Sequence, residues 1–301
     1  MIIIDGCFSI GLVGVLIQNI SFTITVPVYL ATHLLTSPIA KPFPGNYANS
    51  VLLVSSLDLR ILPLSVILGY IIPSILMALP SPSIVSPAAH QWYIASWQVF
   101  PLWAIGAHWS VKFVLGRILK DDINKRPPTS LGATYLSTAK HVYRFALALC
   151  MLTYIPVIAI ILIPSWVFPD ISPTFTLISH CGFLEVFVPY FPLLSHQVPT
   201  LAAGALNFLQ WDLYVGSMSF LLWVILLYRN ATTGKAVVDP NTSLPIYREL
   251  LLREKSQDGM LRRKLIWKIS LWTLLSGPMG ALSILLWERD MIVRHKLKQG
   301  V

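Results

Sequence analysis

Seven apolar segments of this chain are each long enough to cross a bilayer, which takes about 20 residues of α-helix. Inside the hydrocarbon every backbone N–H and C=O must be paired within the protein, and a helix does this for a single segment. With 55% hydrophobic and 12% charged residues, the chain is also too apolar for a soluble globular protein. We therefore predict an all-α fold, a polytopic bundle of about seven transmembrane helices in one domain over residues 1–301. The predicted spans are 8–35, 60–79, 92–117, 142–168, 175–195, 201–228 and 266–287.

The fifth segment, 175–195, is the least regular, because Pro173 just before it and Pro189 and Pro192 within it break its helix, and Glu185 lies at its middle. A re-entrant segment shielded by protein is the alternative to a full span. With seven spans, the basic connection 229–264 is lumenal, and its sequons at Asn230 and Asn241 are open to glycosylation. We expect an integral membrane protein of the endoplasmic reticulum, although neither span count satisfies the positive-inside rule.

The net charge of +9 does not indicate a nucleic-acid partner. The basic residues cluster between the apolar segments, where they set topology and contact anionic lipid headgroups. The sequence also contains no phosphate-binding glycine loop, zinc-binding helix motif or nucleophile elbow. Asp121 and Asp122 could form half of a magnesium site, but a second acidic cluster is missing. We expect no metal and no other cofactor.

The acid Asp212 lies well inside the sixth apolar segment, where a charge costs about 2.5 to 3.5 kcal/mol even on a lenient scale. At helical spacing it shares one stripe with Gly216, Ser219 and Trp223. Small residues beside the acid would leave room for a ligand, and the tryptophan would wall it. The alternative is that Asp212 only accepts hydrogen bonds from a neighbouring helix or pairs with a buried cation.

Two further acids are candidates for the same site. Glu185 lies in the irregular fifth segment, one turn after Gly182, and it could simply be hydrated at a helix break. Asp58 lies at the entrance to the second span, where it could be an interfacial residue paired with Arg60.

Polar and aromatic residues also line up within the first and third spans. In the first, five residues at helical spacing form a stripe that should face protein or a cavity, unless they serve only as contacts between helices. These residues are Gln18, Phe22, Thr25, Tyr29 and Thr32. In the third, Gln98 lies between two tryptophans, Trp97 and Trp103, that are deeper than the interfacial belt.

Four stretches of the chain, 26–38, 68–80, 97–101 and 208–212, resemble those of fungal integral-membrane terpene cyclases of the ascofuranone and macrophorin type. That family cyclises farnesyl chains attached to aromatic or polyketide cores without metal, by protonating a terminal epoxide or alkene. The resemblance implies a meroterpenoid cyclase, an isomerase whose partners are a lipophilic prenylated substrate, the bilayer and other enzymes of the same pathway.

The resemblance also lends a mechanism to the candidate residues. Asp212 would protonate the substrate, because an apolar site keeps a carboxyl group protonated near neutral pH. Asp58 or Glu185 would supply a second acid or accept the final proton. Aromatic faces would stabilise the carbocation. The candidate substrate-binding residues are Tyr29, Gln18, Trp97, Gln98, Trp103 and Trp223.

Two other functions are consistent with intramembrane acids. A transporter of small lipophilic molecules would use them to relay protons, although the chain shows no internal repeat of the kind many transporters have. A non-catalytic scaffold for membrane enzymes would not need them at all.

Overall fold

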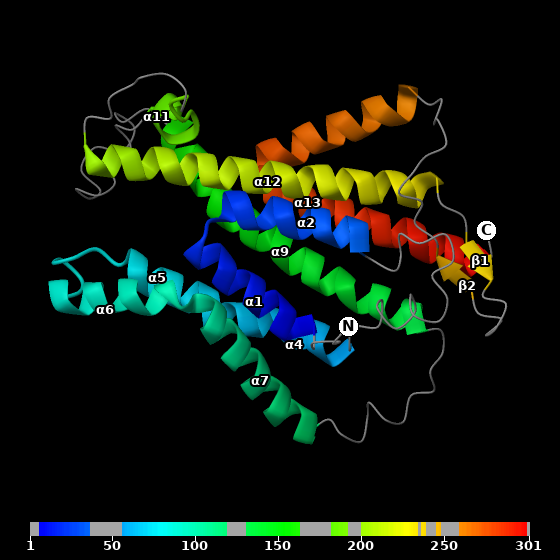
Figure 1. The fold of residues 1–301 in the computed structure, drawn as a ribbon, viewed down its shortest axis with the longest axis horizontal. Coiled ribbons are helices and arrows are strands. Elements are labelled where there is room, and N and C mark those ends of the chain that lie inside the picture. Colours follow the sequence, from blue (N-terminus) through cyan, green and yellow to red (C-terminus); the bar gives the residue numbers. More distant parts are fainter. Residues whose placement is uncertain are drawn as a thin grey trace.

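The computed structural model describes residues 6–36, 56–118, 131–162, 182–191, 200–233, 236–238, 245–247 and 259–299. Asp121, Asp122 and Asn241 lie outside these ranges, whereas the backbone of Asn230 belongs to the last turns of α12. The chain is helical almost throughout (Figure 1). Its helices are α1 Gly6–Asn19, α2 Phe22–Thr36, α4 Ser56–Val66, the π-helix η2 Ile67–Ile71, α5 Ile72–Ala78, α6 Pro87–Gln98, α7 Phe100–Ile118, α9 Leu131–Leu162, α11 Phe183–Phe187, α12 Leu201–Thr233 and α13 Gly259–Gln299.

Four helical stretches are long and apolar enough to cross a membrane: Leu57–Ala78, Thr138–Leu162, Leu201–Arg229 and Arg263–Ile292. Helices α6 and α7 would make a fifth span as a pair bent by 72°, and α2 is a shorter apolar helix. The class predicted from the sequence is confirmed, while the described residues give four or five such spans rather than seven. The described part of segment 175–195 holds only the five-residue helix α11.

A small sheet is the exception to the predicted all-α fold. Strands β1 Ala236–Val238 and β2 Pro245–Tyr247 pair antiparallel in the connection between α12 and α13, with Val237 opposite Ile246. The sheet lies outside the candidate spans, where water can pair the free edges of its strands.

The first predicted span, 8–35, is two helices rather than one. The break is at Ser21, whose φ of 148° is a strained value for a residue with a side chain. Ser21 also begins α2 as its N-cap, since its hydroxyl accepts the N–H of Ile24 at 3.4 Å. The polar stripe predicted for one continuous helix is therefore interrupted: Gln18 belongs to α1, and the other four residues belong to α2.

Prolines and a glycine explain the other irregular turns. The ring of Pro73 would clash with the carbonyl of Gly69 in a regular helix, and the chain widens there into η2, with the Ile72 N–H bonded to the Ile67 carbonyl. Helix α13 is kinked at Gly277, whose φ of 70° suits glycine, directly before Pro278.

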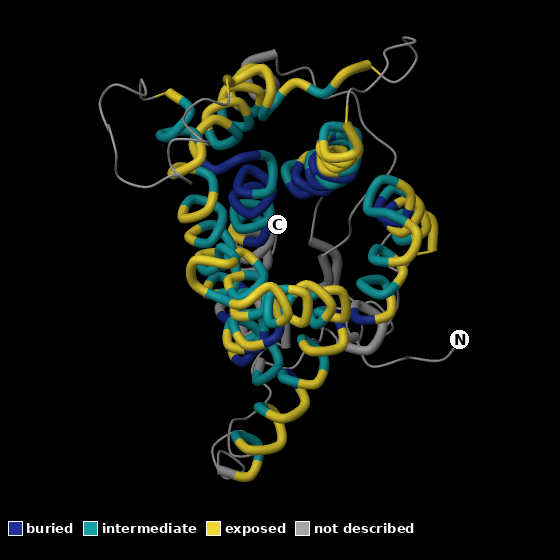
Figure 2. Tube along the Cα trace, turned by 90° about the vertical axis from the view of Figure 1, so that its left-hand side faces the viewer, coloured by how far each residue is buried: buried dark blue, intermediate teal, exposed yellow. Residues whose placement is uncertain are grey.

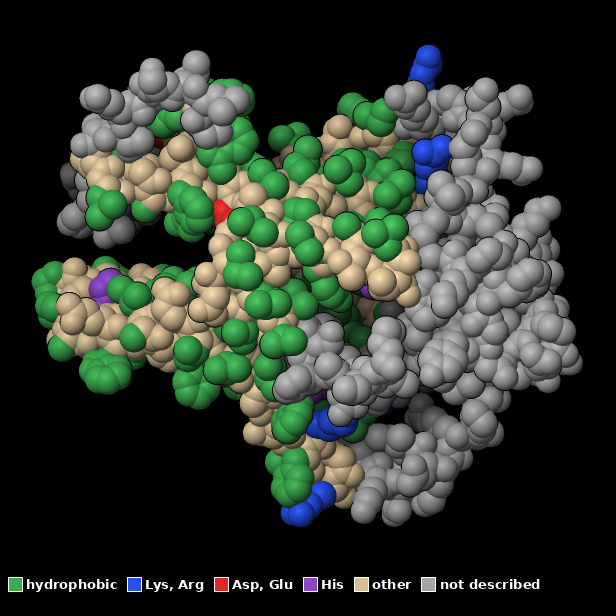
Figure 3. Space-filling model, in the orientation of Figure 1, with side chains coloured by type: hydrophobic (Ala, Val, Ile, Leu, Met, Phe, Trp, Pro, Cys, Tyr) green, Lys and Arg blue, Asp and Glu red, His purple; other side chains and the backbone are tan. Residues whose placement is uncertain are grey.

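Helix α12 packs against α2 and α13, and α13 also packs against α9 (Figure 1). Buried positions lie where helices face one another, and exposed positions cover the outside (Figure 2). Hydrophobic side chains cover much of the described surface in Figure 3, with lysine and arginine toward the periphery. This surface suits lipid, and the buried hydrophobic core contains Leu221, Val224, Tyr228, Ala281, Leu282 and Leu285.

Candidate functional site

Asp212 of α12 lies at the break between α1 and α2. Its Oδ1 accepts two hydrogen bonds, from the Ser21 hydroxyl at 2.9 Å and from the backbone N–H of Thr23 at 2.8 Å. The second bond satisfies one of the donors that the first turn of a helix leaves unpaired. Asp212 therefore caps α2 from α12, and its hydrogen bond with the Ser21 hydroxyl holds this strained residue in place. Both bonds end on Oδ1, so neither of them uses Oδ2.

The stripe predicted to leave room beside Asp212 is filled by protein. The Phe22 ring lies over Gly216, so that a Cβ added there would overlap the ring, and it also packs 6.1 Å from the ring of Phe220. The Ser219 hydroxyl donates to the carbonyl of Val215 in its own helix. The expectation of a ligand space at Gly216 is thus wrong, because the smallest residue admits an aromatic side chain from α2.

The residues around Asp212 on α12 hold the segment that contains α11. The Gln210 amide donates to the carbonyls of Glu185 and Val186, both at 2.8 Å. Trp211 donates to the carbonyl of Tyr190 at 2.7 Å, and Tyr214 donates to that of Phe187 at 2.6 Å. One stretch of α12 therefore fixes two irregular segments, the α1–α2 break through Asp212 and the 182–191 segment through its neighbours.

Glu185 is exposed and occupied within its own short helix. Its Oε2 accepts the backbone N–H of Gly182 at 3.1 Å, which is the glutamate half of a capping box at the start of α11, since Gly182 has no side chain to supply the other half. The carbonyl of Glu185 accepts a hydrogen bond from Gln210 of α12. Asp212 follows Gln210 by two residues, and residues two apart on a helix point to different sides, so Asp212 does not face Glu185. The structure does not bring Glu185 and Asp212 together.

We expect Glu185→Gln to keep the rate of any product formed within about twofold of the unchanged protein. Glutamine serves the same position of a capping box, so the short helix should survive. The rate would be measured in microsomes at matched protein levels. A loss of 100-fold or more would instead make Glu185 the second acid.

Asp58 is part of a polar network between α4 and α7, in which His108 and Ser65 are buried and Lys112 is exposed. Its Oδ1 lies 2.8 Å from the Lys112 ammonium and 3.3 Å from His108 Nε2. The other ring nitrogen of His108 lies 3.2 Å from the Ser65 hydroxyl, which also donates to the carbonyl of Ile61. The expected partner of Asp58, Arg60, is not the one found, because α7 places a lysine and a histidine on the carboxylate.

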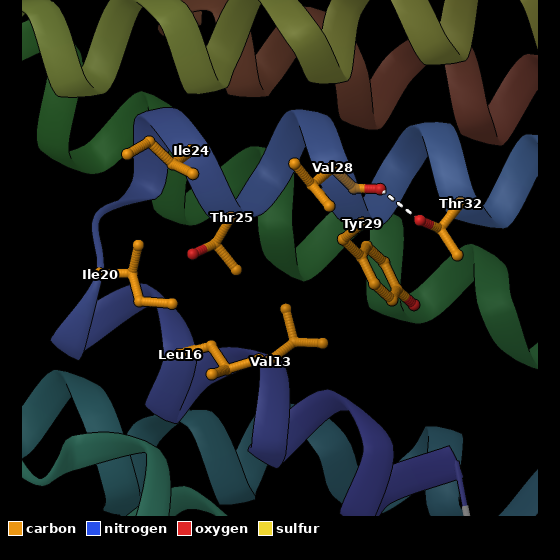
Figure 4. A pocket seen from close by; sticks show the side chains of 8 residues that line it. All are labelled: Val13, Leu16, Ile20, Ile24, Thr25, Val28, Tyr29 and Thr32. Atoms are coloured by element: carbon orange, nitrogen blue, oxygen red, sulfur yellow. Dashed lines mark hydrogen bonds between the residues drawn. The ribbon is translucent and has the colours of Figure 1, made fainter.

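A groove of about 260 Å³ lies between α1 and α2 (Figure 4). Three of the four stripe residues on α2 line it, namely Thr25, Tyr29 and Thr32. The fourth, Phe22, packs on α12 instead. The remaining lining residues are Val13, Leu16, Ile20, Ile24 and Val28.

The other predicted aromatic residues form two separate groups. Trp97 of α6 donates to the Ser74 hydroxyl of α5 at 3.0 Å. Trp103 of α7 donates to the carbonyl of Ser96 at 2.9 Å, across the bend between α6 and α7. The exposed Gln98 ends α6 at the same bend. Trp223 lies elsewhere, edge-on to the ring of His33 at 5.7 Å, between α2 and α12.

Several buried polar groups on or near α2 lack a hydrogen-bond partner among the described residues. Among the described residues, Trp223 Nε1 and His33 Nδ1 are buried without a hydrogen-bond partner, and so is Gln18 Nε2 on α1. Such groups are rare in folded proteins.

Ser21, Thr23 and Gln210, which position the two irregular segments, were not predicted as site residues. The only signal for them in the sequence was the position of Gln210, two residues before Asp212.

Comparison with known proteins identifies the family. The profile of the CtvD domain matches residues 8–294. Terpene cyclase ascI of Acremonium egyptiacum is 26% identical over 93% of this chain and 62% of its own length, and terpene cyclase ctvD of Aspergillus terreus is 26% identical over 93% and 66%. Terpene cyclase penA of Penicillium crustosum is 30% identical over 72% of this chain and 54% of its own length.

The chain therefore spans roughly two thirds or less of the length of these relatives. No solved structure matches it. The matched profile covers nearly the whole chain, including every helix that contributes to the contacts of Asp212. The chain belongs to the CtvD-domain family, and the resemblance to fungal terpene cyclases found in its sequence is confirmed.

Proposed function

We propose that this chain is a membrane-embedded terpene cyclase that isomerises a farnesyl or epoxyfarnesyl chain carried on an aromatic or polyketide core. The observation that carries the proposal is the position of Asp212. Its carboxyl group lies within the candidate span Leu201–Arg229, beside a strained helix break, and its Oδ1 accepts two hydrogen bonds. The names of the relatives, all terpene cyclases, support the same chemistry.

In the proposed reaction, Asp212 gives a proton from Oδ2 to the epoxide oxygen or to the terminal alkene carbon. Protonation opens the C–O bond or converts the alkene to a cation, and a neighbouring alkene supplies the electron pair for each new C–C bond. The last cation loses a proton, so the product is an isomer of the substrate. The carboxylate regains a proton before the next turnover.

The two hydrogen bonds on Oδ1 assist this step. They are present before the reaction, and they stabilise the carboxylate that remains once the proton has left. Donors fixed in advance where charge develops are a large source of rate enhancement. The same two bonds also stabilise the ionised carboxylate before the reaction, so the apolar surroundings must offset this effect to keep the carboxyl group protonated.

The test is product analysis in microsomes containing the full chain. A farnesyl aromatic and its terminal epoxide would be supplied separately, with microsomes lacking the protein as the control. We expect one of them to give a product of unchanged mass and altered chromatographic retention. Substrates recovered unchanged in the presence of folded protein would contradict the proposal, and uptake of intact substrate into sealed vesicles would point to a transporter instead.

A further inference from the structure

The groove between α1 and α2 contains a buried hydroxyl that no side chain or backbone group of the described chain uses. Thr25 is only 8% exposed, and its Oγ1 has no hydrogen-bond partner among the described residues. In Figure 4 its side chain points from α2 into the space faced by Leu16 of α1 and by Ile20, the residue after α1. A buried hydroxyl without a partner loses about 1 to 3 kcal/mol relative to one that is bonded.

Among the described residues, this hydroxyl shares its isolation with two others, those of Ser217 and Thr273, and neither of these lines the groove. A hydroxyl in an apolar helix ordinarily donates to the carbonyl four residues earlier. Eight described residues do so: Thr32, Thr36, Ser65, Ser74, Thr153, Ser219, Ser276 and Ser283. The residue four before Thr25 is Ser21, at the strained break, and its carbonyl accepts the Thr25 backbone N–H at 3.1 Å.

The groove suits an apolar chain that enters from the lipid. Its walls are almost wholly hydrocarbon, and two of its residues on α2, Ile24 and Val28, are 56% and 61% exposed. In a protein surrounded by lipid, that exposed side opens to the bilayer. A linear hydrocarbon could therefore enter sideways without passing through water.

The hydroxyl lies at the end of the groove nearest the proposed acid. Ser21 and Thr23, whose donors hold Asp212, are four and two residues before Thr25 on the same helix. An oxygen bound by Thr25 would thus lie within about one helical turn, or about 5 Å along the helix, of the residues that bind the carboxylate.

We propose that the α1–α2 groove binds the isoprenoid chain of the substrate and that the Thr25 hydroxyl donates a hydrogen bond to an oxygen at the reacting end of that chain. The inference rests on the proposed function for the identity of the chain. Thr25 would be a specificity residue, which favours a terminal epoxide over the corresponding alkene.

The test compares Thr25→Val with Thr32→Val. Both changes replace a hydroxyl by a methyl group of similar size in the same groove, but the Thr32 hydroxyl is already bonded to the carbonyl of Val28 at 2.7 Å. Farnesyl acetate and its terminal epoxide would each compete with a photoreactive farnesyl probe for labelling of the full chain in microsomes. Mass spectrometry would locate the labelled residues.

We expect the unchanged protein and Thr32→Val to bind the epoxide about two- to tenfold more tightly than the alkene, as one hydrogen bond allows. Thr25→Val should lose this preference, keep its affinity for the alkene and melt at the same temperature or higher. A preference retained in Thr25→Val, or absent from the unchanged protein, would overturn the proposal; the second result would fit an ordinary acyl chain in the groove. Preference without a cyclised product would instead count against the proposed function alone.

Discussion

Asp212→Asn is expected to lower the rate of product formation by about 10²- to 10⁴-fold while the protein stays folded. Asparagine keeps an oxygen that can accept the bonds from the Ser21 hydroxyl and the Thr23 N–H, so the cap of α2 should survive. It has no acidic proton to give. The exchange therefore separates the two roles that the position allows, proton donor and helix cap.

Two companion variants make the result interpretable. Asp212→Ala removes the acceptor as well, so it should lower the melting temperature in detergent as well as the rate, since loss of a cap costs about 0.5 to 2 kcal/mol. Ser21→Ala removes one of the two bonds on Oδ1 and leaves the acid in place, so we expect a smaller loss of rate. If Asp212→Asn keeps full activity and Asp212→Ala only destabilises, Asp212 is a cap and not an acid.

The sequence predicts the class of this fold because its cause is local. A run of apolar residues with few charges must form a helix in lipid whatever surrounds it, and each predicted span for which the structure describes enough residues contains helix. The breaks are harder to predict. The sequence indicates the breaks at Pro73 and at Gly277 and Pro278, because proline and glycine disfavour a regular helix. It does not indicate the break at Ser21, where the side chain binds a carboxylate 191 residues away in the chain.

The candidate site was likewise predicted correctly within one helix but not between helices. Spacing along one helix correctly places Thr25, Tyr29 and Thr32 together, because all three belong to α2. It fails between helices: Gly216 is filled by Phe22, Asp58 pairs with Lys112 rather than Arg60, and Glu185 caps its own short helix. Contacts between helices depend on how segments far apart in the sequence pack together, and helical periodicity gives no information about that packing.

Gly69→Ala is expected to be among the most destabilising small changes in this chain. Gly69 lies in the π-helix, and a Cβ added there would lie less than 3.0 Å from the backbone N and Cα of Ala104 on α7. A side chain could rotate away from such a contact, but a helical backbone can yield only if the two helices separate. We therefore expect a loss of about 1 to 3 kcal/mol or more in the free energy of unfolding.

The matched control is Gly106→Ala, two residues beyond Ala104 on α7, where a Cβ would meet nothing within 4 Å. Alanine is the better helix former by about 1 kcal/mol, so this variant should be as stable as the unchanged protein or more so. Melting of the purified proteins in one detergent would rank the three. Separation of η2 from α7 would also loosen the Asp58 network, because His108 and Lys112 lie on α7 just beyond the contact. Equal melting temperatures for Gly69→Ala and Gly106→Ala would mean that the two helices are not in close contact at Gly69, and the packing that positions Asp58 would then need another cause.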